Sequence, residues 1–181
     1  MNKFFIDKGW TLFLDRDGVI NIENPLGYIN TWDKFIFYDG VMDALRIFNS
    51  TFKHILVVSN QRGVSRGITK PGDLAIIHHN MLEEITAAGG RIDKIYFCTD
   101  LEPGSPNRKP NPGMGLQAKN DFVSIDFSKS VMVGNKLSDM EFGRNLGTHT
   151  VFLTTTNPET DTKDPRIDAV YKSLLEFAQN L

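Results

Sequence analysis

The sequence predicts a single-domain α/β fold over residues 1–181, with a central parallel sheet in a three-layer, Rossmann-like arrangement. Short apolar runs recur along the chain without alternating with polar residues, which is typical of strands buried on both faces. Each run is followed by a turn and then by a stretch with helical spacing, the pattern of right-handed βαβ units. The length of 181 residues fits one domain better than two.

The expected strands are β-branched or aromatic and lie at residues 11–14, 55–58, 95–97, 131–133 and 151–153. The clearest helix follows the second strand, because its apolar residues fall on one face and Pro71 and Gly89-Gly90 mark its ends. We expect further helices at about residues 41–48, 112–121, 137–146 and 169–179. Two segments are irregular: residues 21–39, and the polar residues 157–168, which we expect to be a solvated connection.

The composition narrows the classes of partner. With 20 Lys and Arg against 22 Asp and Glu, the chain lacks the basic surplus of a nucleic-acid-binding domain. No run approaches the roughly 18 apolar residues of a membrane span, and charged residues near the start leave no room for a signal segment. One cysteine, Cys98, excludes an internal disulfide. We therefore expect a cytoplasmic protein, a monomer by default, without nucleic-acid or membrane partners.

Polar residues follow four of the five expected strands. They are Asp15-Arg16-Asp17-Gly18, Ser59-Asn60-Gln61-Arg62-Gly63, Arg108-Lys109-Pro110 after a loop, and Gly134-Asn135-Lys136 with Asp139. The carboxyl ends of parallel strands meet at one edge of the sheet, where ligands bind in folds of this class. Carboxylates, a hydroxyl, an amide and a lysine at one edge could hold Mg²⁺ and a phosphate together.

Asp15 and Asp17 are separated by one residue directly after a buried strand. Taken alone, this pattern is as compatible with an ordinary turn that has an Asp cap as it is with a functional site. In the functional interpretation, one carboxylate attacks phosphorus and the second protonates the leaving oxygen and then activates water. Two carboxylates would repel a phosphate dianion, so this chemistry requires a hard cation such as Mg²⁺.

Four segments in order, TLFLDRDGVIN, VVSNQRGVSRG, RKPNPGM and VMVGNKLSDMEFG, resemble the motifs of the haloacid dehalogenase superfamily of phosphatases. The resemblance runs from about Thr11 to Leu153 and is greatest to the branch that contains the heptose bisphosphate and histidinol-phosphate phosphatases. It implies a small-molecule phosphate ester, in the first instance a sugar bisphosphate, as substrate. The motifs leave no room for a large cap domain, so loops after the strands must shape the pocket.

The resemblance also implies a role for individual residues. Asp15 would be the nucleophile and Asp17 the general acid and base, while Ser59 and Lys109 would bind the transferring phosphoryl oxygens. Magnesium would be held by Asp15, Asp17 through its main-chain carbonyl, Asn135 and Asp139. Substrate contacts would come from Glu23, Gly27, Tyr28, Asn60, Gln61, Arg62, Arg108 and Lys136, with Arg108 as the candidate for a second phosphate.

The sequence departs from the family pattern at the fourth motif, which commonly begins Gly-Asp where this chain has Gly134-Asn135. An Asn oxygen can ligate Mg²⁺ but adds no charge, so we expect an active enzyme with a higher Mg²⁺ requirement. Two alternatives stay open. The enzyme could act on histidinol phosphate or another small phosphate monoester, or the chain could be a catalytically silent binder of a phosphate compound.

A second departure concerns zinc. Many members of this branch carry a Cys-x-His and Cys-x-Cys loop, of which only Cys98 is present here, and one thiolate cannot make a closed zinc site. We therefore expect no structural zinc. His78 and His79 are adjacent on a helix and point in different directions, so we expect these two histidines, like His54 and His149, to be structural or surface residues.

Overall fold

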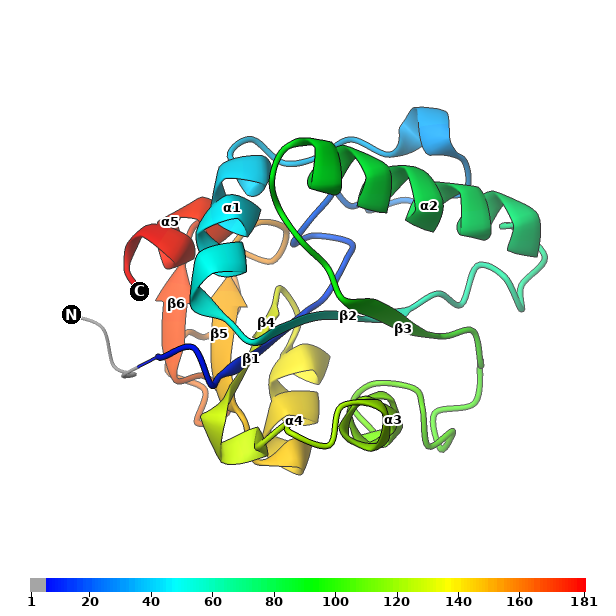
Figure 1. Cartoon of the computed structure of the whole chain (residues 1–181). Coiled ribbons are helices and arrows are strands. Elements are labelled where there is room, and N and C mark those ends of the chain that lie inside the picture. The colour runs from blue at the N-terminus through cyan, green and yellow to red at the C-terminus, as the bar shows by residue number, and fades with distance from the viewer. Residues whose placement is uncertain (1–5) are drawn as a thin grey trace.

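A parallel six-stranded sheet forms the centre of the computed structural model, which describes residues 6–181 (Figure 1). The strands run in the order β3-β2-β1-β4-β5-β6. They are β1 Thr11–Leu14, β2 His54–Asn60, β3 Lys94–Cys98, β4 Ser130–Gly134, β5 His149–Leu153 and β6 Ala169–Tyr171. The helices are α1 Val41–Thr51, α2 Pro71–Ala87, α3 Gly113–Asp121, α4 Leu137–Leu146 and α5 Leu174–Gln179, with short 3₁₀ turns η1 Trp32–Lys34 and η2 Phe127–Lys129. The predicted α/β class with a parallel sheet is confirmed.

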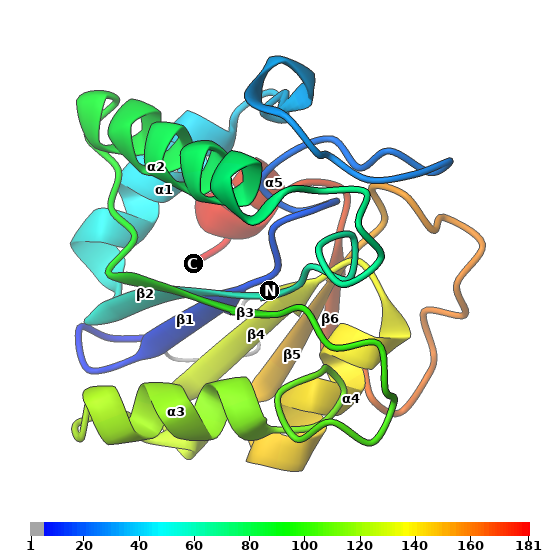
Figure 2. The same cartoon turned by 90° about the vertical axis from the view of Figure 1, so that its right-hand side faces the viewer.

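Helices cover both faces of the sheet, with α1, α2 and α5 on one side and α3 and α4 on the other (Figures 1 and 2). The side chains of β1 alternate between two apolar clusters. Leu12 and Leu14 pack in the cluster that contains the buried residues of α1, α2 and α5, whereas Phe13 packs with Phe142 of α4 and Met114 of α3. Because both faces are covered, the strand is an unbroken apolar run, as its sequence indicated.

The pairing register brings the ends of the central strands to one edge. Leu14 at the end of β1 lies opposite Val57 of β2 and Val133 of β4. The next residue, Asp15, donates its amide N–H to the carbonyl of Val133 at 3.0 Å. The loops that follow β1, β2, β3 and β5 gather at this edge, on the right-hand side of Figure 2.

The end of the chain differs from the prediction. Residues 169–179 were expected to form one helix, but Ala169–Tyr171 is strand β6 and α5 contains only Leu174–Gln179. Val170 lies opposite Phe152, so the segment extends the sheet by a parallel strand. Ser173 then begins the helix, because its hydroxyl accepts a hydrogen bond from the amide of Glu176. A three-residue strand next to a capping serine is too short to show its own periodicity.

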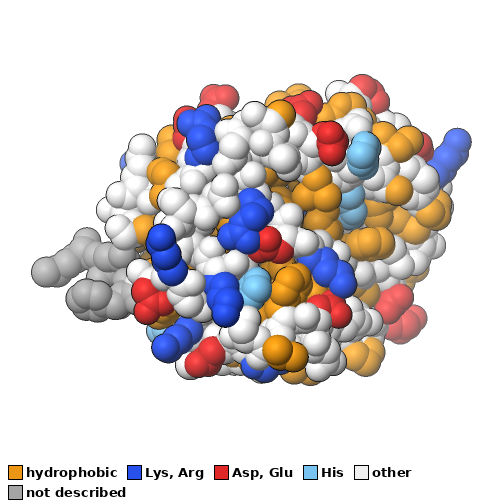
Figure 3. Space-filling view, in the orientation of Figure 1, with side chains coloured by type: hydrophobic (Ala, Val, Ile, Leu, Met, Phe, Trp, Pro, Cys, Tyr) orange, Lys and Arg blue, Asp and Glu red, His pale blue; other side chains and the backbone are white. Residues whose placement is uncertain are grey.

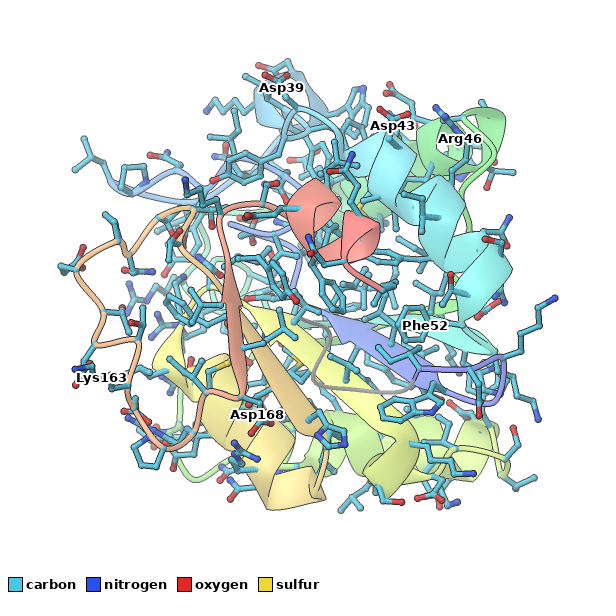
Figure 4. All side chains as sticks on the ribbon, turned by 90° about the vertical axis from the view of Figure 1, so that its left-hand side faces the viewer. Asp39, Asp43, Arg46, Phe52, Lys163 and Asp168 are labelled. Atoms are coloured by element: carbon cyan, nitrogen blue, oxygen red, sulfur yellow. The ribbon has the colours of Figure 1, made fainter. Side chains whose placement is uncertain are left out.

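The segment between β5 and β6 is only partly the solvated connection that its sequence predicted. Its middle, around Lys163, is exposed and swings away from the sheet, whereas Asp168 lies at the start of β6 (Figure 4). The carboxylate of Asp168 accepts from the amide of Thr150 at 2.9 Å and from Arg144 at 2.5 Å. The other end, at Asn157, donates to the main-chain oxygen of Asn135 at 2.8 Å. Both ends are therefore bound to the body of the domain.

The surface carries charges of both signs. On the face shown in Figure 3, Lys and Arg side chains are interspersed with Asp and Glu. No helix among the described residues is long and apolar enough to cross a membrane.

Candidate active site

A cavity of about 780 Å³ opens at the edge of the sheet where the strands end. It is lined by residues from all four predicted motifs and from the loop after β1: Asp15, Asp17, Glu23, Gly27, Tyr28, Ser59, Asn60, Arg62, Arg108, Lys109, Lys136 and Asp139. Two further predicted residues, Gln61 and Asn135, lie directly behind this wall and bond to residues in it. The sequence therefore identified residues that the fold brings together.

Lys109 joins two carboxylates from different motifs. Its Nζ lies 3.0 Å from Oδ1 of Asp15 and 2.7 Å from Oδ1 of Asp139, and all three side chains are almost fully buried. Burial alone would lower the pKa of Lys109, but Asp139 and Asp15 outweigh it and raise the pKa. Burial raises the pKa of Asp15 to about 6, against the lowering effect of Lys109. At neutral pH Lys109 is therefore protonated and Asp15 is mostly ionised.

Asp17 is held by three donors. Nη2 of Arg16 lies 2.9 Å from both of its carboxylate oxygens, and the side-chain amides of Asn21 and Gln61 each donate to it at 2.9 Å. Burial works to raise the pKa of Asp17, but Arg16 and the hydrogen bonds outweigh it and hold the pKa below its usual value. The Asp17 side chain is therefore ionised and fixed in one orientation.

Arg16 is itself enclosed. Its side chain is inaccessible to solvent, its Nη1 lies 3.2 Å from Nε2 of His78, and its guanidinium lies 5.9 Å from the centre of the Phe35 ring. Because arginine only donates, the His78 nitrogen must be the acceptor, and the imidazole is neutral. Arg16, Asn21 and His78 were not among the predicted site residues. The position of Arg16 between the two aspartates could have identified it as a site residue. No feature of the sequence indicated its contact with His78.

Asn60 links the second motif to the third. Its Nδ2 donates to the main-chain oxygen of Lys109 at 3.1 Å, and its Oδ1 accepts from the main-chain N–H of Lys109 at 3.0 Å. Asn60 therefore sets the position from which the Lys109 side chain reaches the carboxylates. Ser59 is buried beside it and accepts from Gln61 at 2.9 Å.

A second polar group surrounds Asn135, whose side chain is fully buried. Its Nδ2 donates to Oε2 of Glu23 at 3.2 Å and to Oγ1 of Thr156 at 2.5 Å, while its Oδ1 has no hydrogen-bond partner among the described residues. The other oxygen of Glu23 forms an ion pair with Lys136. Thr156 belongs to the stretch Thr155 to Asn157, which was not predicted to be part of the site. Its position directly after the fifth expected strand was the available signal.

The residues present fit a hard cation. Within residues 6–181 no three Asp, Glu, His or Cys side chains form a metal-binding group on their own, so a cation would also need main-chain and amide oxygens. The buried Oδ1 of Asn135, which has no hydrogen-bond partner among residues 6–181, is such an oxygen, and the main-chain N–H of the same residue lies 3.2 Å from a carboxylate oxygen of Asp139. Mg²⁺ is commonly bound by one or two carboxylates with further oxygen ligands and water, which this donor set can provide.

The loop that carries Arg108 is tied by polar contacts. The Asn111 side chain donates to the carbonyls of Pro103 at 2.9 Å and Ser105 at 2.8 Å, and Arg108 donates to the carbonyl of Leu101. Cys98 lies under this loop, and burial raises the pKa of its thiol. The absence of zinc stays a prediction.

The outer part of the cavity is basic. Arg62, Arg66, Arg108 and Lys136 line it, and the Arg66 guanidinium lies 5.9 Å from the centre of the Tyr28 ring. These cations stand farther out than the buried Lys109, so the cavity has a charged inner end and a separate basic wall.

Comparisons with known families, sequences and solved structures give consistent matches. A HAD-hydrolase-like family model matches residues 106–177. The D-glycero-alpha-D-manno-heptose-1,7-bisphosphate 7-phosphatase of Campylobacter jejuni is 40% identical over 142 residues, which are 78% of this chain and 80% of that protein. The D-glycero-beta-D-manno-heptose-1,7-bisphosphate 7-phosphatase of Escherichia coli K12 is 36% identical over 178 residues, with 93% and 91% covered. The crystal structure of the D,D-heptose 1,7-bisphosphate phosphatase from B. bronchiseptica, complexed with magnesium and phosphate, superposes with a TM-score of 0.86 at 25% identity, covering 94% of this chain and 96% of that one.

Proposed function

This chain belongs to the haloacid dehalogenase-like hydrolases, together with the heptose bisphosphate phosphatases to which it is similar. We therefore propose that it is a Mg²⁺-dependent phosphatase that removes the C7 phosphate of D-glycero-D-manno-heptose 1,7-bisphosphate. The observation that carries the proposal is the buried Asp15–Lys109–Asp139 group at the inner end of a basic cavity. In this group a carboxylate that could act as the nucleophile is in direct contact with an ammonium group that could bind phosphoryl oxygens, which supports the proposal.

The first step breaks the phosphorus–oxygen bond to the sugar. An oxygen of the Asp15 carboxylate attacks phosphorus and forms an aspartyl-phosphate, while the departing C7 oxygen takes a proton from Asp17. Asp15 is available as a nucleophile at pH 7.5 because this pH lies above its raised pKa of about 6. The scheme requires Asp17 to carry a proton in this step, and a phosphoryl dianion beside it favours the protonated form by like-charge repulsion.

The second step returns the enzyme to its starting state. Asp17 takes a proton from a water molecule, whose oxygen attacks the aspartyl-phosphate and releases inorganic phosphate and the free Asp15 carboxylate. Arg16, Asn21 and Gln61 fix the orientation of Asp17 for both proton transfers. Asp17 can act as this base because it gave its proton to the leaving C7 oxygen in the first step, and accepting a proton from water restores its starting state.

Lys109 and Ser59 bind the transferring phosphoryl oxygens in this scheme, because charge on those oxygens must be stabilised in a loose transition state. Mg²⁺ would be held by Asp15, the Asp17 carbonyl, Asn135 and Asp139, and when bound it neutralises charge between the phosphate and the carboxylates. Arg108, with Arg62 on the same basic wall, would hold the phosphate that is not cleaved. The proposal includes a cytoplasmic monomer, which cell fractionation and size-exclusion chromatography would test.

The deciding experiment measures phosphate release from the α and β anomers of the heptose 1,7-bisphosphate with Mg²⁺, with histidinol phosphate as the competing substrate. We expect kcat/KM for one heptose anomer to exceed that for histidinol phosphate by at least about a hundredfold, since two phosphates meet two basic regions. Higher kcat/KM for histidinol phosphate would contradict the substrate assignment. An inactive wild type that still binds phosphate compounds would support a binding role, to which the uncharged Asn135 is the only pointer in the described residues.

A further inference from the structure

We propose that Glu23 and Thr156 are positioning residues for the cation: together they turn the Asn135 amide so that its oxygen, and not its nitrogen, is available as a ligand. The inference rests on the magnesium site of the proposed function and adds two residues to it. Glu23, predicted above as a substrate contact, thereby acts mainly through Asn135.

The orientation of the amide follows from its partners. An asparagine side chain has an oxygen that accepts and a nitrogen that donates, and the two ends have almost the same shape. Oε2 of Glu23 lies 3.2 Å from Nδ2 of Asn135, and an ionised carboxylate only accepts hydrogen bonds. The amide nitrogen must therefore face Glu23. Its second hydrogen bond, to Oγ1 of Thr156 at 2.5 Å, uses the remaining N–H.

The oxygen of the same amide is left over. Oδ1 of Asn135 is buried in a side chain that is inaccessible to solvent, and no residue from 6 to 181 gives it a hydrogen bond. A buried acceptor without a partner is unfavourable unless a ligand or ion occupies the position in front of it. If the amide were reversed, its N–H groups would meet a cation and exclude it. Glu23 and Thr156 thus decide whether residue 135 is a ligand or an obstacle.

Both positioning residues are held from a second side. The Glu23 carboxylate is bound through its other oxygen to Lys136. Thr156 accepts a hydrogen bond from Nδ2 of Asn157 at 3.1 Å, and the same Nδ2 donates to the main-chain oxygen of Asn135 at 2.8 Å. Next to it, the hydroxyl of Thr155 donates to the main-chain oxygen of Gly18 at 2.5 Å. The segment after β5 therefore fastens the amide to the ends of both β1 and β4.

Glu23 also places a negative charge next to residue 135, where the side chain itself has none. The main chain at residue 135 is bound separately by Asp139, whose Oδ2 accepts from the main-chain N–H groups of Asn135 and Lys136 at 3.2 and 3.0 Å. Residue 135 is thus fixed at its backbone by one carboxylate and at its side chain by another. Loss of Glu23 should therefore weaken cation binding more than loss of Thr156.

The test is Mg²⁺ binding measured by titration calorimetry without substrate, together with thermal unfolding in EDTA. We expect Thr156→Val to raise the Kd for Mg²⁺ about fivefold, because it removes an acceptor for the Asn135 amide. We expect Glu23→Gln to raise this Kd about tenfold, because it removes the negative charge of the other acceptor. Thr156→Ser, which keeps the hydroxyl, and Thr160→Val, a control in the same segment, should stay within about twofold of the wild type.

A second background separates orientation from general stability. In Asn135→Asp both side-chain ends are oxygens, so orientation no longer matters and Thr156→Val should change the Kd for Mg²⁺ less than twofold. The inference is overturned if Thr156→Val and Glu23→Gln bind Mg²⁺ like the wild type, whether or not they melt at lower temperature. It is also overturned if the effect of Thr156→Val persists unchanged in Asn135→Asp. A wild type that binds no Mg²⁺ and releases no phosphate would instead refute the proposed function.

Discussion

His78 is predicted to make the protein sensitive to acid. It is 8% exposed, and burial together with the neighbouring Arg16 lowers its pKa from 6.5 to about 4. Below pH 6.5 the unfolded chain takes up a proton at this residue that the folded chain refuses. Since the unfolded state then binds more protons than the folded state, stability falls as the pH falls from about 6.5 to 4.

The size of the effect follows from the two pKa values. At pH 5 the imidazole is almost fully protonated in the unfolded chain and mostly neutral in the folded one, which costs about 2 kcal/mol of the free energy of unfolding relative to pH 7.5. Asp15 acts in the opposite direction over part of this range, because its pKa is raised to about 6 in the folded state and protonation there is favourable. A comparison of variants at both pH values removes this contribution.

The assay is urea unfolding in EDTA at pH 7.5 and pH 5.0, followed by tryptophan fluorescence. His78→Gln keeps an acceptor for Arg16 but does not titrate, so between the two pH values it should lose about 2 kcal/mol less than the wild type. His79→Gln, on the exposed side of the same helix, should lose as much as the wild type. Equal losses in the wild type and His78→Gln would refute the assignment of a neutral, buried His78.

Four further predictions concern the site. Asp15→Asn should lower phosphate release at least about a thousandfold with unchanged circular dichroism, and substantial turnover in this variant would exclude Asp15 as the nucleophile. Lys109→Met leaves two carboxylates buried without their cation, so urea unfolding without metal should show a loss of about 3–5 kcal/mol. Gly18→Ala places a Cβ 2.1 Å from Nδ2 of Asn135 at a φ of +86°, which should cost about 1–3 kcal/mol in the same assay, whereas Gly104→Ala, with open space around it, should be nearly neutral. Asn135→Asp should reach half-maximal activity at a lower Mg²⁺ concentration, and an unchanged requirement would show that the amide does not limit cation binding.

The sequence predicted the sheet and its edge because both depend on local patterns. A strand covered on two faces must be apolar throughout, so β1 and β4 were visible as runs, and the polar residues after them marked the edge. The same logic placed Asp15, Ser59, Lys109 and Asp139 near one another without reference to their contacts. Strand β6 was missed because its three residues carry no period, and its pairing with β5 is a long-range property.

The parts of the site that escaped prediction depend on contacts between distant segments. His78 is one of several residues on the inner face of α2, and only the folded structure shows that it meets Arg16, 62 positions earlier. Asn157 was assigned to the polar connection at residues 157–168, and Thr156 directly before it was given no role, because hydroxyl and amide side chains are common in loops. Both bond to Asn135, which directly follows β4, and no local pattern reports a contact between segments more than 20 positions apart, here 21 and 22.

The charges of the site explain why an amide at position 135 is compatible with phosphate chemistry. At its buried centre three carboxylates, Asp15, Asp17 and Asp139, face two cations, Arg16 and Lys109, which leaves one negative charge. A divalent cation makes this centre positive, and a phosphoryl dianion makes it negative again by one charge. A fourth carboxylate at position 135 would strengthen cation binding and add repulsion toward the dianion. Asn135 therefore binds Mg²⁺ more weakly than an aspartate would, but it also repels the substrate less. Asn135→Asp should raise KM for the bisphosphate at saturating Mg²⁺ and lower the Mg²⁺ concentration that activity requires.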